Sequence, residues 1–511
     1  MHGRLGYWIL LVLASWSSVC AQVTNFALAS TPRVVAWPLS VAVADLNGDG
    51  KPDLVSASWG STRGALTVLT NDGSGGFGLN AVLWSGGSGP QTVTVADVNG
   101  NGKPDLITAN TFENNVTAWT NNGHGVFGTD VTLSVANGPD YVTAADVNGD
   151  GQPDLISVNG AVNTPESLLI LTNNGSGTFI FNATVNASLG FTAGNGGAGV
   201  YALAAADING DGKPDLIRAN FNAFSLTVFT NNGNGIFSSN VTLNPWALQP
   251  RDVVVADVNG DGKPDLVSTC SSQLGGLPRP TGYVAVFTNN GAGSFGTNAA
   301  QIFGPPSVSL VAADMNGYGK PDLVTADVYD NLLWIWTNNG NGVFGSNATV
   351  SVAGAPTSIA SADLNRDGKP DIICASHGPS ALGYPGYLSV FTNDGSGGFG
   401  FDATLNAGAY PFVVVAADVN GDGRLDLITA NLGTNNLSVL LNMPYVDIGA
   451  QTNGEMLVWP YPSSGYVLQE NADLGTSNWV DVTNPVNFIG GRNQVTLPAP
   501  AANNFFRLMH P

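Results

Sequence analysis

The sequence predicts an all-β fold: a β-propeller of eight blades, followed by a small C-terminal domain resembling a β-sandwich. One nine-residue pattern recurs eight times, at intervals of 49 to 61 residues. A repeated unit of roughly fifty residues is the size of a four-stranded propeller blade. Short apolar segments surround every copy, and no stretch has helical periodicity over a useful length.

The repeated pattern is rich in Asp, Asn and Gly, and its copies share the same spacing. They read DLNGDGKPD from Asp45, DVNGNGKPD from Asp97, DVNGDGQPD from Asp146, DINGDGKPD from Asp207, DVNGDGKPD from Asp257, DMNGYGKPD from Asp314, DLNRDGKPD from Asp363 and DVNGDGRLD from Asp418.

Each unit reads as four strands with short connections. An apolar segment such as SVAVAD leads into the loop, and a run such as DLVSAS follows it. A second apolar run such as LTVFTN comes next, and then a Gly-rich turn and a last polar-apolar strand. Alternating strands and turns of this kind indicate one antiparallel sheet per unit.

The two ends of the repeat region predict how the ring closes. The eighth unit stops at Leu441-Asn442 without a fourth strand. The text TNFALAS from Thr24 resembles the fourth-strand text SNATVSV from Ser346. We therefore expect the N-terminal strand to complete the last blade. Seven blades plus a stray repeat is the alternative.

The loop pattern is typical of a calcium site. Calcium takes six to eight oxygen ligands from carboxylates, amides, carbonyls and water. Positions 1, 3, 5 and 9 offer oxygen side chains, position 7 offers its carbonyl, and position 6 is always Gly, as a sharp turn needs. The expected ligands are Asp45, Asn47, Asp49, Lys51, Asp53; Asp97, Asn99, Asn101, Lys103, Asp105; Asp146, Asn148, Asp150, Gln152, Asp154; Asp207, Asn209, Asp211, Lys213, Asp215; Asp257, Asn259, Asp261, Lys263, Asp265; Asp314, Asn316, Lys320, Asp322; Asp363, Asn365, Asp367, Lys369, Asp371; and Asp418, Asn420, Asp422, Arg424, Asp426.

An EF-hand begins with similar text, but it needs Glu at position 12 and flanking helices. Position 12 of the first copy is Ser56, and a β-type run follows. The loops hold 22 of the 37 acidic residues, so up to eight structural calcium ions would offset much of the net charge of −21. Asn101 lowers the charge of the second loop. Tyr318 removes a ligand from the sixth, which we expect to be weak or empty.

The N-terminus predicts export. Residues 1–21 combine a short basic start, an apolar run and a small residue at Ala21, as a signal peptide does. Lipid attachment at Cys20 is the alternative. No later stretch is a transmembrane candidate, so we expect a secreted or cell-surface protein and a monomer. Cys270 and Cys374 fall two blades apart and are expected to be buried thiols. The acidic balance argues against nucleic acid as a partner.

These repeats resemble the FG-GAP/VCBS family, whose loop has this Asp-x-Asn-Gly-Asp-Gly-x-Pro-Asp pattern and whose turns precede Phe-Gly, as in Gly76-Phe77-Gly78. The family includes integrin α-subunit propellers, fungal sugar-binding propellers and many secreted bacterial proteins. The resemblance implies a calcium-loaded propeller over residues 22–443. Residues 444–511 resemble a short C-terminal β-domain of exported planctomycete and verrucomicrobial proteins. This domain either packs as a small sandwich or serves in surface attachment.

A ligand is expected on the face away from the loops. The segments Ser188–Gly199, Ser271–Gly282 and Ser376–Gly386 vary in length there, and variable loops on a rigid frame are where recognition usually lies. The candidate ligand-binding residues are Trp59, Trp246, His377 and Tyr384.

Three functions fit the sequence. The favoured one is a binding or adhesion module for carbohydrate or a cell-surface protein. The alternative is a calcium-dependent, lyase-like enzyme acting on uronic-acid polymers, which needs a base and cations. Only four His and 16 Lys plus Arg are present, and no catalytic motif stands out. The third is a structural surface protein without a small ligand.

Overall fold

The structure is a computed structural model of the 511-residue chain. It describes residues 25–60, 63–85, 89–135, 138–159, 165–191, 202–221, 223–245, 248–271, 282–302, 307–378, 384–443, 447–451, 454–460, 467–471, 478–489, 492–498 and 505–509. The predicted signal peptide, including Cys20, and the candidate ligand residue Trp246 lie outside these ranges.

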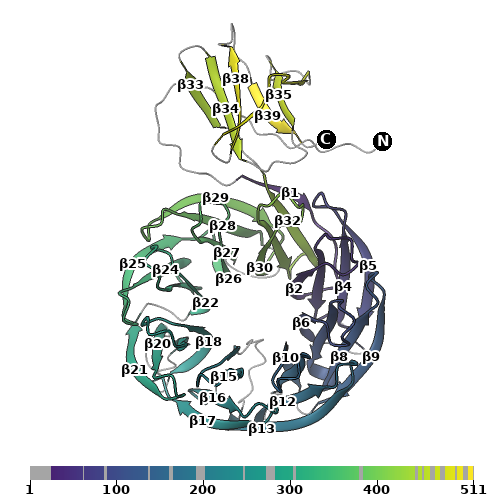
Figure 1. The fold of residues 1–511 in the computed structure, drawn as a ribbon, viewed down its shortest axis with the longest axis vertical. Coiled ribbons are helices and arrows are strands. Elements are labelled where there is room, and N and C mark those ends of the chain that lie inside the picture. Colours follow the sequence, from purple (N-terminus) through teal and green to yellow (C-terminus); the bar gives the residue numbers. More distant parts are fainter. Residues whose placement is uncertain are drawn as a thin grey trace.

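Eight four-stranded antiparallel sheets form a closed ring (Figure 1), as the sequence predicts. In blades 1 to 7 the strands follow chain order from the centre outward. Blades 1 to 4 are β2 (Pro38–Ala44), β3 (Asp53–Ser58), β4 (Ala65–Asn71), β5 (Phe77–Trp84); β6 (Pro90–Ala96), β7 (Asp105–Asn110), β8 (Asn115–Asn121), β9 (Phe127–Ser134); β10 (Pro139–Ala145), β11 (Asp154–Asn159), β12 (Pro165–Asn173), β13 (Phe179–Phe191); and β14 (Leu203–Ala206), β15 (Asp215–Asn220), β16 (Ser225–Asn231), β17 (Phe237–Leu243). Blades 5 to 7 are β18 (Gln249–Ala256), β19 (Asp265–Ser271), β20 (Gly282–Asn289), β21 (Phe295–Ile302); β22 (Ser307–Ala313), β23 (Asp322–Asp327), β24 (Leu332–Asn338), β25 (Phe344–Ser351); and β26 (Ala355–Ala362), β27 (Asp371–His377), β28 (Gly386–Asn393), β29 (Phe399–Ala407).

Blade 8 is completed by the start of the chain. Its first three strands are β30 (Pro411–Ala417), β31 (Asp426–Asn431) and β32 (Asn436–Asn442), and its fourth is β1 (Phe26–Ser30). Phe26 pairs with Asn442, and Met443 N–H donates to the Asn25 carbonyl at 2.6 Å. The expected closure is confirmed, and the seven-blade alternative is wrong.

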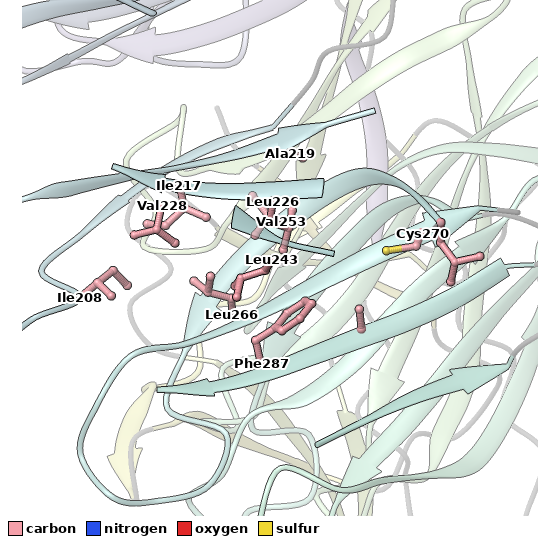
Figure 2. Packing of buried hydrophobic residues seen from close by; sticks show 12 residues of the cluster. Ile208, Ile217, Ala219, Leu226, Val228, Leu243, Val253, Leu266, Cys270 and Phe287 are labelled. Atoms are coloured by element: carbon pink, nitrogen blue, oxygen red, sulfur yellow. The ribbon is translucent and has the colours of Figure 1, made fainter. Parts of the chain in front are cut away.

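The apolar core lies between the blades. All six residues of each second strand are buried in blades 1 to 4, because alternate side chains point to opposite faces and each face meets a neighbouring blade. Ile217 and Ala219 of β15 pack toward Leu266 and Phe287 of blade 5 (Figure 2), whereas Leu216 belongs to the cluster shared with blade 3. Every blade therefore needs both neighbours to bury its central strands.

The blades alternate between two forms. In even blades exactly four residues connect the second and third strands, namely 111–114, 221–224, 328–331 and 432–435. The first of these turns contains η1, a single 3-10 turn (Thr111–Glu113). In odd blades the connections are longer: 59–64, 160–164, 272–281 and 378–385. The ring thus repeats as four units of two blades.

Seven strands follow the propeller and lie outside the ring (Figure 1). One sheet contains β33 (Asp447–Gln451), β34 (Gly454–Pro460), β37 (Asn487–Ile489) and β38 (Arg492–Pro498), and the other contains β35 (Val467–Asn471), β36 (Val480–Asp481) and β39 (Phe505–Met509). Their own apolar cluster includes Leu457, Trp459 and Phe506.

Two further expectations can be compared with the described residues. Cys270 and Cys374 are buried free thiols, as predicted, and burial raises the pKa of Cys270 to about 12. No helix in the described part of the chain is long and apolar enough to span a membrane.

Candidate functional site

The eight repeated loops connect the first and second strands of every blade and share one hydrogen-bond pattern. In the first loop, Asp45 Oδ2 accepts the Gly50 N–H at 2.9 Å, and Asp45 Oδ1 accepts the Asp49 N–H at 3.2 Å. Asn47 Oδ1 also accepts the Asp49 N–H, at 2.8 Å. These three bonds recur in all eight loops. The backbone therefore holds positions 1, 3 and 5 around one turn.

Position 9 is a buried Asp in every loop. Asp53 Oδ2 accepts the Leu46 N–H at 3.0 Å, and its Oδ1 accepts the Asn71 N–H at 2.8 Å. Burial raises the pKa of Asp53, these N–H donors lower it, and the nearby charges of Asp49 and Asp45 raise it again. Burial likewise raises the pKa of Asp371 to about 6 and that of Asp426 to about 8.

The lysine side chain at position 7 connects its loop to the Gly-rich turn of the same blade. Lys51 Nζ donates to the Asp72 carbonyl at 2.8 Å, in the Gly-rich turn of the same blade. Lys213, Lys263 and Lys369 make the equivalent bond. The ammonium also lies 3.9 Å from Asp211, 3.8 Å from Asp261 and 3.7 Å from Asp367, the position 5 carboxylates. Since a lysine side chain has no lone pair to offer while it is charged, position 7 can supply a cation only with its carbonyl.

The donor set fits a hard divalent cation. The three carboxylates of a full loop are close enough for their charges to raise the position 9 pKa, and an oxygen that accepts one N–H keeps a second lone pair. A cation among them would offset both repulsion and burial. No group of three or more His, Cys, Asp and Glu side chains in the described ranges is already close enough to form a metal cluster.

The second and sixth loops differ, as their sequences suggest. Tyr318 is 82% exposed and adds no carboxylate to the sixth loop. There the Asn316 amide donates to Asp322 Oδ1 at 3.1 Å, and Asn99 makes a 3.5 Å contact of the same kind with Asp105. In the two loops without Asp at position 5, an amide thus satisfies the buried carboxylate.

An asparagine that the sequence interpretation missed links neighbouring loops. Asn121 Nδ2, at the end of β8, donates to the Leu46 carbonyl of the first loop at 2.7 Å. Its N–H donates to Asp105 of its own loop at 2.6 Å. The same pair of bonds recurs at Asn71, Asn173, Asn231, Asn289, Asn338, Asn393 and Asn442. The Asn71 side chain donates to the Val419 carbonyl, so the same hydrogen bond also joins blades 8 and 1. The signal was present, because all eight third strands end in Asn.

The opposite rim carries the aromatic candidates. Trp59 lies in the connection after β3 and makes an edge contact with Phe112, with ring centroids 5.2 Å apart. His377, at the end of β27, stacks on Tyr410 at 4.2 Å, and Tyr384 is 47% exposed. The structure thus places His377 and Tyr384 on blade 7 and Trp59 on blade 1, with blade 8 between them.

One known family matches the chain. The model of the FG-GAP-like repeat matches residues 45–108, 97–157, 159–218, 207–268, 314–374 and 380–429, which together are more than half of the chain and include all eight loops. A search of curated proteins found no match.

Solved structures are similar in fold. Sqt1 from Chaetomium thermophilum is 10% identical with a TM-score of 0.54, covering 80% of this chain and 98% of that chain. A Lactobacillus plantarum protein is 12% identical with a TM-score of 0.47, covering 75% and 98%. An Agrocybe aegerita lectin, described as recognising non-reducing terminal N-acetylglucosamine, is 20% identical with a TM-score of 0.40, covering 72% and 93%.

The matched residues contain the loops whose geometry is described above, and eight such units close into one ring. The chain therefore belongs to the FG-GAP-like repeat family, as an eight-bladed β-propeller.

Proposed function

We propose that this protein is an exported, calcium-binding propeller that acts as a binding module for carbohydrate or a cell-surface protein. The observation that carries the proposal is the contrast between the two rims of the ring. One rim repeats the same hydrogen-bonded loop eight times, and the other differs from blade to blade and bears exposed aromatic side chains.

Calcium has a structural role in this proposal. The carboxylates of positions 1, 5 and 9 and the amide of position 3 would hold the ion, together with the position 7 carbonyl, as in the first loop with Asp45, Asn47, Asp49, Lys51 and Asp53. Raised pKa values at position 9 support it, since a cation would stabilise the charged carboxylates.

Recognition belongs to the opposite rim because the loop oxygens are committed to backbone N–H groups and to metal. Aromatic rings with polar neighbours suit both protein surfaces and sugar rings. Phe112, Tyr329 and Tyr384 are exposed there, and Arg251 lies over the Phe221 ring at 4.9 Å.

The proposal is tested by comparing Trp59→Ala and Tyr384→Ala with Asp49→Ala. Calcium-loaded proteins are applied to an array of neutral and uronate polysaccharides, and their melting curves are recorded in parallel. We expect the aromatic variants to lose about five- to thirtyfold in binding at unchanged melting temperature, since a lost stacking contact is worth on the order of 1–2 kcal/mol. Asp49→Ala is expected to lower the melting temperature.

The choice of rim would be wrong if Asp49→Ala abolished binding at full stability while both aromatic variants bound normally. Calcium itself would then contact the ligand. Binding of no polysaccharide, together with no binding to cell surfaces, would contradict the binding function as a whole.

A further inference from the structure

Two aromatic residues beside blade 8 have a backbone conformation that aromatic residues rarely adopt. Trp37 precedes β2 with φ of 62°, and Tyr410 precedes β30 with φ of 54°. In this left-handed region a bulky side chain is strained, and the following Pro38 and Pro411 restrict the backbone further. Strain of this kind persists where the surrounding structure enforces it, and it clusters at functional sites.

Blade 2 shows that the backbone alone does not require aromatic residues at these positions. Its turn, residues 111–114, lies between Gly89 and Gly138, both with positive φ. The Thr111 N–H donates to the Gly89 carbonyl at 3.3 Å, and the Gly138 N–H donates to Asn114 Oδ1 at 2.7 Å.

The blade 8 turn, residues 432–435, makes the same bonds with aromatic residues. The Leu432 N–H donates to the Tyr410 carbonyl at 2.9 Å, and the Trp37 N–H donates to Asn435 Oδ1 at 2.8 Å. Tyr410 and Trp37 therefore occupy the positions at which blade 2 has Gly89 and Gly138, and they make the equivalent hydrogen bonds.

The two turns also differ at their second residue, where blade 2 has the aromatic residue and blade 8 has the glycine. Blade 2 carries Phe112 there, 58% exposed, whereas blade 8 carries Gly433. In blade 2 an aromatic ring stands on the turn between two glycines. In blade 8 two aromatic residues flank a turn whose second residue has no side chain.

The same two residues connect the ligand candidates on either side of blade 8. The His377 ring stacks on Tyr410 with an interplanar angle of 13°. The Trp59 N–H donates to the Trp37 carbonyl at 3.0 Å, and the Trp37 side chain is 38% exposed. A ring contact on one side and a backbone hydrogen bond on the other thus link the candidates of blades 7 and 1 to the two residues that flank the blade 8 turn.

We propose that Trp37, Tyr410 and the turn 432–435 form the principal subsite of the recognition rim, which takes a pyranose ring of a polysaccharide. The subsite rests on the proposed binding function and names its location and ligand class. Aromatic rings stack on the apolar face of a sugar. The exposed Thr434 lies on the turn between them; its hydroxyl donates to Asn436 Oδ1 at 2.6 Å and keeps lone pairs that can accept from a sugar hydroxyl. In this subsite the rings of Trp37 and Tyr410 contact the ligand.

The test uses the full chain with Tyr410→Gly and Trp37→Gly, loaded with calcium and applied to an array of neutral and uronate polysaccharides. Glycine adopts positive φ without strain, so both variants are expected to melt at the wild-type temperature or a few degrees above it. Binding of the polysaccharide that wild type captures is expected to fall at least about tenfold. Tyr410→Asn, which also tolerates this conformation, is a second variant in case glycine loosens the connection. Phe401→Ala, which removes a 62% exposed aromatic side chain from the outer strand β29 of blade 7, is the matched control and is expected to bind normally.

Wild-type binding of both Gly variants would overturn the subsite and leave the binding function standing, and so would an equal loss of binding in Phe401→Ala. A lower melting temperature with normal binding in both Tyr410 variants would show that the rings serve packing, which also overturns it. If wild type captures no polysaccharide on the array, the carbohydrate ligand class and this subsite fail together. Binding to a cell-surface protein would then be the part of the proposed function that stands.

Discussion

The asparagine at the end of each third strand connects two blades through one buried side chain. Asn231 donates from Nδ2 to the Val147 carbonyl of blade 3, and its N–H donates to Asp215 of its own loop. Its Oδ1 accepts the Gly233 N–H. Its Nδ2 also donates to the Pro214 carbonyl at 3.1 Å. Removal of this side chain takes away the bonds to the Pro214 carbonyl and the Gly233 N–H, whereas the Val147 carbonyl still accepts the Gly235 N–H.

We therefore expect Asn231→Ala to lower the free energy of unfolding by about 1–3 kcal/mol, because unsatisfied buried polar groups lose their full desolvation cost. Urea denaturation at saturating calcium measures it. Asn232→Ala changes the exposed neighbour and is expected to cost well under half as much. Equal losses in the two variants would contradict a special role for the buried residue.

Asp252 on β18 has a carboxylate at a position where the following blade has a hydroxyl side chain. Its Oδ2 accepts the Leu310 N–H of blade 6 at 3.1 Å. Ser309 Oγ accepts the Ile359 N–H of blade 7 at 3.2 Å in the same way. Burial raises the pKa of Asp252 to about 6, although the N–H groups of Leu310 and Val253 lower it.

An acid whose pKa is higher in the folded state destabilises the fold when it is ionised. Wild type should therefore gain stability from this group as the pH falls from above about 6 toward about 4, and Asp252→Ser should not. Between about pH 7.5 and 4.5, the difference in unfolding free energy should move in favour of wild type by about 1–2 kcal/mol. Denaturation of both proteins at both pH values and saturating calcium measures this, and a constant difference would count against the raised pKa.

Among the structural elements, the repeated loops are the ones that the sequence predicts best. Aspartates at fixed spacing predicted both the loop and the buried strand after it, because position 9 begins that strand in all eight blades. The bonds of Asn121 to Leu46 were not predicted, since they join residues of different blades. The left-handed backbone at Tyr410 was not predicted for a related reason: it accompanies a hydrogen bond to the turn of blade 8, which is distant in sequence.

The sixth loop should be convertible into a full site. Tyr318→Asp restores the carboxylate that six of the other seven loops have at position 5, so we expect calorimetric titration to show about one additional calcium ion per chain. Tyr318→Ala serves as the control and should add none. Asp261→Ala, in the intact fifth loop, is expected to destabilise the protein more than Tyr318→Ala does. An unchanged stoichiometry in Tyr318→Asp would contradict this account of the loop.

At the scale of the whole molecule, all eight loops lie on one rim and are joined by the asparagine bonds, so calcium should stabilise the ring as a unit. Binding to the native state alone adds about 2.7 kcal/mol per site at a hundredfold excess over Kd. EGTA treatment should therefore lower the melting temperature markedly, and re-addition of calcium should restore it. A melting curve that EGTA leaves unchanged would rule out structural calcium.

The pairing of β1 with β32 sets the order in which the molecule can be completed. Phe26 is among the first propeller residues to be synthesised, and its partner Asn442 is among the last. Blades 1 to 7 each contain only consecutive strands, so their pairing is local in sequence. The eighth sheet requires closure over nearly the whole propeller, which is entropically costly and slow. Until then β32 presents an open edge, of the kind that pairs with other chains. Completion of the ring is thus the step at which this protein is most exposed to misassembly.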